Sequence, residues 1–315
     1  MVGSNVKRAA KVLVCDTIHE DGVRMLQEAG FQVDMRTTIA PDELVKAVGD
    51  YDALVVRSRT KVTESILAVG KRLKVVARAG VGLDNVDVKA AKSRGIEVVN
   101  SPEAPSNAVA ELVLVFMLSL VRRIPESDAS MKRGEWIKSK LSGSELRGKT
   151  LGIIGFGRIG YLVAKKAKAL GMNVLAFDVI MDQLIGFVRE AGAEPASMKE
   201  LLASSDFVTT HVPLLPETRH MIGRGEIDGM KRGAYLINTS RGAIVDEAAL
   251  REALTSGKLA GAALDVYEEE PPKDTSLTGL RNAVCTPHIG AETEEAQRAN
   301  STIVAEKLIK ALRVS

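Results

Sequence analysis

The sequence predicts an α/β protein with two doubly wound parallel sheets. Three observations lead to this prediction: short apolar runs alternate with helical segments before residue 100, a glycine-rich turn follows the apolar run 151–154, and the alternation then resumes. Alternating strands and helices are typical of a parallel sheet covered by helices on both faces. The length of 315 residues also favours two domains, at about 150 residues per domain.

The first series of alternating elements occupies residues 11–99. Runs rich in Val, Leu and Ile predict strands at residues 11–15, 31–34, 53–56, 73–77 and 96–99. Helices are expected between them at residues 21–29, 41–48, 63–69 and 86–93, and the glycines that follow them are Gly30, Gly49, Gly70 and Gly95. Glycine is common just after a helix, so each of these glycines supports the helix before it.

Residues 101–148 interrupt the alternation. The segment 101–105 contains two prolines and predicts a rigid connector, after which Ser106 or Asn107 is expected to cap a long apolar helix ending near Arg122. A polar helix over 126–133 and a basic, irregular arm follow it. An apolar helix beside an exposed arm leads us to expect a homodimer contact, and an inter-domain strut is an equally good explanation of the same pattern.

The turn Gly155-Phe-Gly-Arg-Ile-Gly160 lies between an apolar strand and a helix expected over 161–170. In this pattern Gly155 permits a tight turn, Gly157 lets the backbone approach a pyrophosphate, and Gly160 lets the helix pack closely on the strand. The helix N-terminus then offers N–H groups to the phosphates. A purely structural turn would also use glycines, so the surrounding sequence has to support a dinucleotide site.

Asp178 supplies that support. It ends a second apolar strand, 173–177, and lies 18 residues after Gly160, close to the spacing of about 20 expected for a carboxylate that binds the adenosine ribose. A carboxylate at this position would repel a 2′-phosphate. The sequence therefore predicts NAD rather than NADP as cofactor.

The second series of elements completes the domain plan. Further strands are expected at 206–211, 234–238, 260–266 and 283–286, with helices at 246–256 and 292–312. No strand follows the last helix, so it can return to the first series. We therefore predict a Rossmann NAD-binding domain over residues 102–288, inserted into a flavodoxin-like substrate-binding domain made of residues 1–101 and a returning helix over 289–315.

Composition argues against several classes of protein. The 43 basic and 40 acidic residues give a net charge of +3, and aromatic residues make up only 3%, so no nucleic-acid partner is expected. The apolar stretch 108–121 contains Glu111 and is too short to span a bilayer, so no membrane segment is predicted. Cys15 and Cys285 lack metal-ligand spacing. The sparse cysteines favour a reduced, cytoplasmic location, and we predict no metal site.

Three side chains near predicted strand ends suit hydride transfer to or from a 2-hydroxy acid. Arg241 presents a planar guanidinium that matches a substrate carboxylate, His288 can exchange a proton near neutral pH, and Glu270 can raise the pKa of a neighbouring histidine. Each residue alone has an ordinary alternative. Arg241 would serve equally as a helix cap or phosphate ligand, His288 as a loop histidine, and Glu270 as the end of a solvated acidic run.

Four motifs together resemble the signatures of the D-isomer-specific 2-hydroxyacid dehydrogenases. They are Gly155-Phe-Gly-Arg-Ile-Gly160, Asn238-Thr-Ser-Arg-Gly-Ala-Ile-Val-Asp-Glu247, Gly261-Ala-Ala-Leu-Asp-Val-Tyr-Glu-Glu-Glu-Pro271 and Thr286-Pro-His-Ile-Gly-Ala291. The separations of 29 residues from Arg241 to Glu270 and 18 residues from Glu270 to His288 match those of the family. The resemblance covers essentially the whole chain and implies that these three residues are catalytic.

The resemblance also implies a cofactor set and a substrate. The cofactor positions that carry over are Gly155, Gly157, Arg158, Ile159, Gly160, Asp178, His211, Val212, Pro213, Thr239, Ser240, Asp265, Gly290, Ala291 and Val81. Within the family, Val56-Arg-Ser-Arg-Thr-Lys-Val-Thr63 and the segment 78–87 are most similar to members that act on 3-phospho-D-glycerate. That similarity implies a phosphate at Arg57 and Arg59, and a carboxylate at the backbone of Ser58 and Gly80, with Arg241 and His288 also contacting the substrate.

The resemblance therefore predicts NAD-dependent oxidation of 3-phospho-D-glycerate to 3-phosphohydroxypyruvate, the first step of phosphorylated serine biosynthesis. We also expect a short form without the C-terminal regulatory domain of many such members. Two alternatives stay open: a glyoxylate or hydroxypyruvate reductase or another D-2-hydroxyacid dehydrogenase, and a non-enzymatic, NAD-sensing co-repressor that binds partner proteins.

Overall fold

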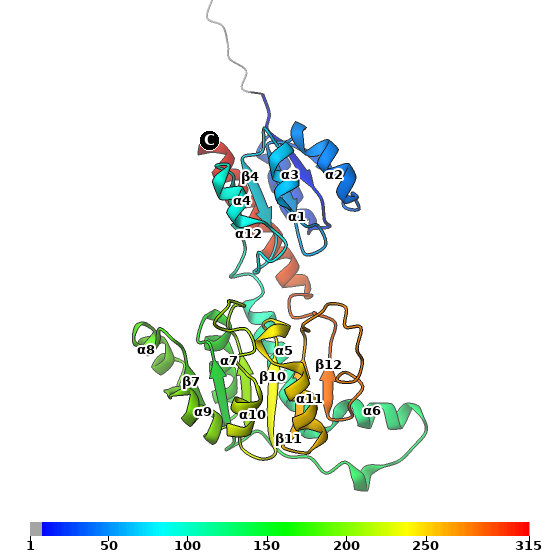
Figure 1. Cartoon of the computed structure of the whole chain (residues 1–315), viewed down its shortest axis with the longest axis vertical. Helices are drawn as coiled ribbons and strands as arrows, with labels where there is room; N and C mark the ends of the chain where they lie inside the picture. The colour runs from blue at the N-terminus through cyan, green and yellow to red at the C-terminus, as the bar shows by residue number, and fades with distance from the viewer. Residues whose placement is uncertain (1–7, 315) are drawn as a thin grey trace, which may run out of the picture. The chain divides into compact units, whose positions relative to one another are not determined.

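The computed structural model describes residues 8–314, which form two compact units (Figure 1). Unit 1 comprises the residues up to Pro105 together with those from Ala291 onward, and unit 2 comprises Ser106–Gly290. Each unit contains one parallel sheet, so the predicted class of two parallel-sheet α/β domains is confirmed. No helix within the described residues combines the length and the apolar composition needed to cross a membrane.

Unit 1 contains a five-stranded sheet in the order β2-β1-β3-β4-β5, with every pair parallel. The strands are β1 (Lys11–Val14), β2 (Gln32–Met35), β3 (Ala53–Val56), β4 (Val75–Arg78) and β5 (Glu97–Asn100). This order is that of a flavodoxin-like doubly wound sheet. Each strand lies within two residues of its predicted position.

Helices cover both faces of this sheet. Leu13 and its neighbours pack against α2 (Pro41–Ala47), α3 (Glu64–Val69) and α4 (Val88–Ser93), whereas Val12 packs on the side of α1 (Glu20–Glu28) and α12 (Glu294–Val314). Successive residues of a strand point to opposite faces, so a strand covered on both faces has to be apolar throughout. The fully buried run Ala53–Val56 meets that requirement.

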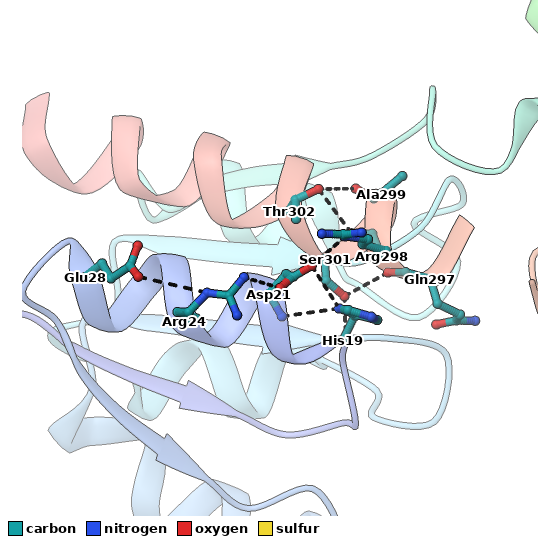
Figure 2. Close-up of polar contacts among 9 residues, drawn as sticks. All are labelled: His19, Asp21, Arg24, Glu28, Gln297, Arg298, Ala299, Ser301 and Thr302. Carbon is teal, nitrogen blue, oxygen red and sulfur yellow. Dashed lines mark hydrogen bonds and ion pairs between the residues drawn. The ribbon is translucent and has the colours of Figure 1, made fainter. Parts of the chain in front are cut away.

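The helices α1 and α12 lie side by side although they come from opposite ends of the chain (Figure 2). A Cβ at Gly22 would lie 2.7 Å from the backbone oxygen of Ser301, so only glycine permits this approach. The backbone N–H of His19 donates to Ser301 Oγ at 2.8 Å, and Arg298 forms an ion pair with Asp21. These contacts attach the last helix to unit 1.

Unit 2 contains a seven-stranded parallel sheet in the order β12-β11-β10-β9-β6-β7-β8. The strands are β6 (Thr150–Ile154), β7 (Asn173–Phe177), β8 (Glu194–Pro195), β9 (Phe207–Thr210), β10 (Ala234–Asn238), β11 (Leu259–Leu264) and β12 (Ala283–Cys285). Counted from β6, the order is that of a Rossmann fold with one additional strand. The order reverses between β6 and β9, and the glycine-rich turn follows β6 at this switch point.

Two helical layers cover the unit 2 sheet. One layer consists of α5 (Ser106–Arg122), α7 (Arg158–Ala169) and α8 (Met181–Glu190), and the other of α9 (Met198–Ser204), α10 (Arg224–Gly229) and α11 (Glu247–Thr255). The helices α8, α9 and α10 and the strand β8 were not predicted from the sequence. Ser106 or Asn107 was expected to cap α5, whereas the helix already includes Ser106, directly after Pro105.

The helix α6 (Ile124–Lys132) and the segment after it extend away from the unit 2 sheet (Figure 1). This arm includes a short 3₁₀ turn, η2 (Lys138–Lys140), and Trp136, whose exposed fraction is 78%.

Candidate active site

The glycine-rich turn after β6 is shaped by close backbone approaches. Gly155 has a φ of +92°, and a Cβ there would lie 2.7 Å from the backbone oxygen of His211. A Cβ at Gly160 would lie 2.5 Å from the backbone oxygen of Gly155. Nothing lies within 4 Å of the Cβ position at Gly157. The turn is therefore tight at its two ends and open at its middle glycine.

The helix α7 begins at this open position. Gly157 is its N-cap residue and provides no side-chain hydrogen bond, so the N–H groups of the first turn, from Arg158 and Ile159 onward, receive no side-chain cap. Uncapped N–H groups and the positive end of a helix dipole bind anions. The turn and the helix start thus fit the pyrophosphate of a dinucleotide.

Asp178, directly after β7, is oriented by the same turn. Its Oδ2 accepts from the N–H of Phe156 at 2.8 Å, and its Oδ1 accepts from the N–H of Ile180 at 3.1 Å. Each carboxylate oxygen can accept more than one hydrogen bond, so acceptor capacity remains for ribose hydroxyls. These residues therefore fit NAD, including its adenosine ribose.

The other predicted cofactor positions of unit 2 follow strands at the same edge of the sheet. His211, Val212 and Pro213 follow β9, Thr239 and Ser240 follow β10, Asp265 follows β11, and Gly290 comes after β12. Burial of its ring lowers the pKa of His211 to about 3, and its Nε2 lies 3.1 Å from Thr209 Oγ1. His211 is therefore neutral at physiological pH and does not suit proton exchange.

Glu270 and His288 form a hydrogen-bonded pair. His288 Nδ1 lies 2.7 Å from Glu270 Oε2, and the N–H of Tyr267 donates to Glu270 Oε1 at 3.1 Å. The hydrogen bond that His288 donates to Glu270 is the main cause that raises the pKa of His288. Burial alone would raise the pKa of Glu270, but the hydrogen bond and charge of His288 lower it overall. The pair favours a carboxylate beside a histidine that is protonated at higher pH than usual.

Arg241 lies close enough to affect both members of this pair. Its positive charge acts to lower the pKa of Glu270 and that of His288. Its Nη1 donates to the backbone oxygen of Ser240 at 2.7 Å. The structure thus brings together the three residues predicted to be catalytic, on loops that follow β10, β11 and β12.

Two residues that support this trio were assigned no such role from sequence. Asp265, 1% exposed, accepts from Thr286 Oγ1 at 2.6 Å and from the N–H groups of Ile289 and Gly290 at 2.7 and 2.8 Å, which fixes the turn that carries His288. The hydroxyl of Tyr267 donates to the backbone oxygen of Thr286 at 3.0 Å. His288 has a φ of +54°, a conformation that a non-glycine residue adopts only when its surroundings hold it.

Unit 1 carries the residues predicted to bind the substrate phosphate, and a buried carboxylate orders their loop. Asp16, 4% exposed, accepts from the N–H of Arg57 at 2.6 Å and from Thr60 Oγ1 at 2.6 Å. On the other side of the loop, Asn85 Nδ2 donates to the backbone oxygens of Arg57 and Thr60, each at 2.6 Å. Sequence reasoning missed Asp16, although an acid directly after an apolar strand is the signal that identified Asp178.

The two arginines of this loop differ in how they are paired. Arg59 Nη2 lies 2.9 Å from Asp16 Oδ1 and also donates to the backbone oxygens of Cys15 and Thr37, the latter at 2.9 Å. Arg57 Nη2 donates to Glu292 Oε1 at 2.6 Å. Arg59 is therefore held by a buried carboxylate and by backbone oxygens, although its side chain is half exposed, whereas the partner of Arg57 is the exposed Glu292.

The remaining predicted contacts of unit 1 are Ser58 in the loop after β3, Gly80 and Val81 after β4, and Ala291 before α12. Ser58 is exposed, and Gly80 has a φ of +144° with its N–H donating to Ser101 Oγ at 2.8 Å. A substrate carboxylate at Gly80 would have to share or replace that bond. The backbone oxygens of Val81 and Ala291 accept from the side chains of Asn100 and Gln297 at 2.6 and 3.1 Å.

Comparisons with protein families, curated proteins and solved structures agree on one family. The profile described as D-isomer specific 2-hydroxyacid dehydrogenase, NAD binding domain, matches residues 114–290, more than half of the chain. The D-3-phosphoglycerate dehydrogenase of Methanocaldococcus jannaschii is 51% identical over 304 residues, covering 96% of this chain and 57% of that protein. The hydroxypyruvate reductase of Thermotoga maritima is 44% identical over 307 residues, covering 96% of this chain and 99% of that protein.

Among solved structures, the crystal structure of TT0316 protein from Thermus thermophilus has a TM-score of 0.86 at 37% identity, covering 96% of this chain and 97% of that chain. The chain spans a little over half the length of the curated phosphoglycerate dehydrogenases that it matches. The matching profile is that of an NAD-binding domain, which identifies NAD as the cofactor.

Proposed function

The chain belongs to the family of D-isomer-specific 2-hydroxyacid dehydrogenases, and we propose that within it the chain oxidises 3-phospho-D-glycerate to 3-phosphohydroxypyruvate. This reaction is the first step of phosphorylated serine biosynthesis. The observation that carries the choice of substrate is the loop with Arg57 and Arg59, which Asp16 and Asn85 hold in one conformation. Relatives named D-3-phosphoglycerate dehydrogenase support it.

In this proposal unit 2 binds NAD and supplies the catalytic side chains. Arg241 orients the substrate carboxylate and polarises the reacting oxygen. Since Nδ1 of His288 faces a carboxylate that can only accept, Nδ1 carries a proton and Nε2 is left to take the proton of the substrate hydroxyl. Glu270 stabilises the imidazolium that forms. NAD, which the glycine-rich turn and Asp178 would hold, would supply the acceptor for the hydride that leaves C2 of the substrate.

Unit 1 supplies the groups that distinguish the substrate in this proposal. Arg57 contacts the phosphate directly, because a guanidinium matches a phosphate with two parallel hydrogen bonds. Arg59 contributes its positive charge from a fixed position. The backbone of Ser58 and Gly80 binds the carboxylate.

A second candidate, a hydroxypyruvate reductase, is favoured by two observations. The Thermotoga maritima relative with that name is covered almost completely by this chain. In addition, Arg57 and Arg59 are each paired with a carboxylate of their own unit, which reduces the positive charge available to a phosphate. In this alternative the cofactor and the catalytic trio are the same, and the reaction runs toward reduction.

The test is NADH-linked turnover of the purified chain with phosphohydroxypyruvate, hydroxypyruvate and glyoxylate at several concentrations. The proposal expects a kcat/KM at least about tenfold higher for the phosphorylated compound, since a charge-assisted contact contributes about 1.5–3 kcal/mol. A higher kcat/KM for hydroxypyruvate or glyoxylate would assign the chain to the reductase branch.

We further propose that the enzyme is a homodimer formed through α5 and the arm that follows it. The exposed apolar side chains Val115 and Leu118 on α5, and Ile124, Met131 and Trp136 on the arm, would be covered in such a dimer. Sedimentation equilibrium of the chain and of Leu118→Glu tests this, with a dimer expected for the former and a monomer for the latter. The free thiols of Cys15 and Cys285 support a cytoplasmic location.

A further inference from the structure

The ion pair between Arg57 and Glu292 joins the loop after β3 to the residues just before α12, all within unit 1. Arg57 Nη2 lies 2.6 Å from Glu292 Oε1, and the side chains are 24% and 48% exposed. The second carboxylate oxygen of Glu292 accepts from Gln297 Nε2 at 2.8 Å. A guanidinium proposed to bind an anionic substrate group thus already carries an internal anion.

The two partners of this pair differ in how firmly they are held. The backbone of Arg57 is fixed on both sides, by Asp16 at its N–H and by Asn85 at its carbonyl oxygen. Glu292 lies outside the helix, and its carboxylate is held by two exposed or half-buried side chains. Releasing Glu292 therefore requires only a rotation of its own side chain into solvent.

In the ion pair between Arg59 and Asp16, in the same loop, the carboxylate cannot rotate away into solvent. The partner of Arg59 is Asp16, which is almost fully buried and also accepts from Arg57 and Thr60. Removing Asp16 from Arg59 would leave a buried carboxylate without its ion-pair partner, which is strongly unfavourable. Of the two arginines, only Arg57 can exchange its internal anion for an external one.

We propose that Glu292 is a specificity-determining residue: its carboxylate occupies Arg57 in the free enzyme and must be displaced by the anionic group at C3 of the substrate. This inference rests on the proposed contact between Arg57 and that group. A substrate with an uncharged hydroxymethyl group at C3 leaves the pair intact, whereas a phosphorylated substrate has to break it. Glu292 thereby lowers the preference for phosphorylated substrates that Arg57 would otherwise confer.

The variant Glu292→Gln tests this directly, because it keeps the size of the side chain and removes the charge. The quantity to measure is the ratio of kcat/KM for phosphohydroxypyruvate to that for hydroxypyruvate. We expect the ratio to rise about two- to fivefold, the range of a partly exposed ion pair. The rise should come from a lower KM for the phosphorylated substrate, with little change in kcat.

Glu295→Gln is the matched control. Glu295 lies in the first turn of α12, so this variant makes the same change in net charge and nearly the same change at the helix N-terminus. It should leave the ratio at the value of the unmodified enzyme. An equal rise in both variants would show a general charge effect and would overturn the role of Glu292.

The combination with Arg57→Gln completes the experiment. In the Arg57→Gln background, Glu292→Gln should no longer change the ratio of kcat/KM values. If Arg57→Gln does not fold, Arg57→Lys replaces it, and Glu292→Gln should then change the ratio less than it does in the unmodified enzyme. A ratio that is unchanged or lower in Glu292→Gln overturns the inference, even if the unmodified enzyme prefers phosphohydroxypyruvate. If the unmodified enzyme prefers hydroxypyruvate, the proposed substrate is wrong. A ratio that rises in Glu292→Gln would in that case still support the action of Glu292 on Arg57.

Discussion

The strand ends of unit 1 and of unit 2 both carry a basic side chain paired with a carboxylate, but the basic partner is an arginine in unit 1 and a histidine in unit 2. In unit 2, His288 pairs with Glu270, and that hydrogen bond raises the pKa of the histidine. In unit 1, Arg59 pairs with the buried Asp16, which also accepts from Arg57 and Thr60. The same kind of contact fixes a loop in unit 1, whereas we propose that in unit 2 it supports the exchange of a proton.

The largest effect is expected from removing the titrating partner in unit 2. His288→Ala should lower kcat by about 10²–10⁴-fold, because no other group in the trio can take the substrate proton. NAD binding, measured by fluorescence titration, should change little, since the glycine-rich turn is not altered. Unchanged turnover would exclude His288 as the acid–base, and His211, with its pKa of about 3, is not a replacement.

Removing the carboxylate of the pair between Arg59 and Asp16 in unit 1 should mainly lower the stability of the protein. Asp16→Ala removes the acceptor for Arg57, Arg59 and Thr60, and we expect the free energy of unfolding to fall by about 1–3 kcal/mol. KM for the substrate should rise because the loop loses its order. Urea unfolding measures the first effect, with the exposed Asp42→Ala as control. Equal stability of the two variants would contradict the framework role of Asp16.

A change at Glu270 tests whether the pair in unit 2 sets the pH dependence of turnover. Glu270→Gln removes the main cause of the raised pKa of His288, so that pKa should fall toward its ordinary value. Oxidation needs neutral His288, so the acidic limb of the pH profile of kcat for oxidation should move to lower pH. Reduction needs protonated His288, so the alkaline limb of the pH profile of kcat for reduction should also move to lower pH. At the optimum kcat should fall about tenfold, as expected for loss of a charge-assisted hydrogen bond of about 1.5 kcal/mol.

The pH profiles of kcat in both directions are the measurement, and Glu269→Gln, an exposed neighbour, is the control. Profiles that stay in place after Glu270→Gln would mean that another group sets the pKa seen in turnover.

The smallest effect is expected at Asp178, which we propose to contact the adenosine ribose, away from the proton transfer. Asp178→Ala should reduce the preference for NAD over NADP by about fivefold, as expected for removal of a repulsion of about 1 kcal/mol in water. The ratio of kcat/KM for the two cofactors measures this preference, and the pH profile should not move. An unchanged ratio would argue against a ribose contact.

Sequence reasoning recovered the elements and residues that carry a local signal. The strand β6 and the turn after it are readable because the apolar run and the glycines are adjacent in the chain. The capping box of Ser197 and Glu200 that begins α9 is an equally local signal and was overlooked. The helix α8 was overlooked as well, although Met181, Leu184 and Val188 are spaced as one face of a helix and pack on the unit 2 core.

Contacts between distant positions could not be predicted in the same way. Asp16 is 41 residues from Arg57, and Glu292 is 235 residues from it, so no spacing rule connects them. The role of Asp265 in holding the turn at His288 likewise depends on two strand ends meeting at one edge of the sheet. Parallel sheets bring such residues together, and only the folded structure shows which of them bond.

The packing of α12 on unit 1 has a consequence for the order of events during synthesis (Figure 2). The ribosome delivers all of Ser106–Gly290 before the helix that covers Val12 and Val55 of the first sheet. Until then this nascent sheet exposes an apolar face of the kind that chaperones bind. Prior folding of unit 2 shortens the flexible segment whose ends must meet, and so lowers the entropic cost of closure. We therefore expect unit 1, whose residues up to Pro105 are synthesised first, to be the last to reach its native state.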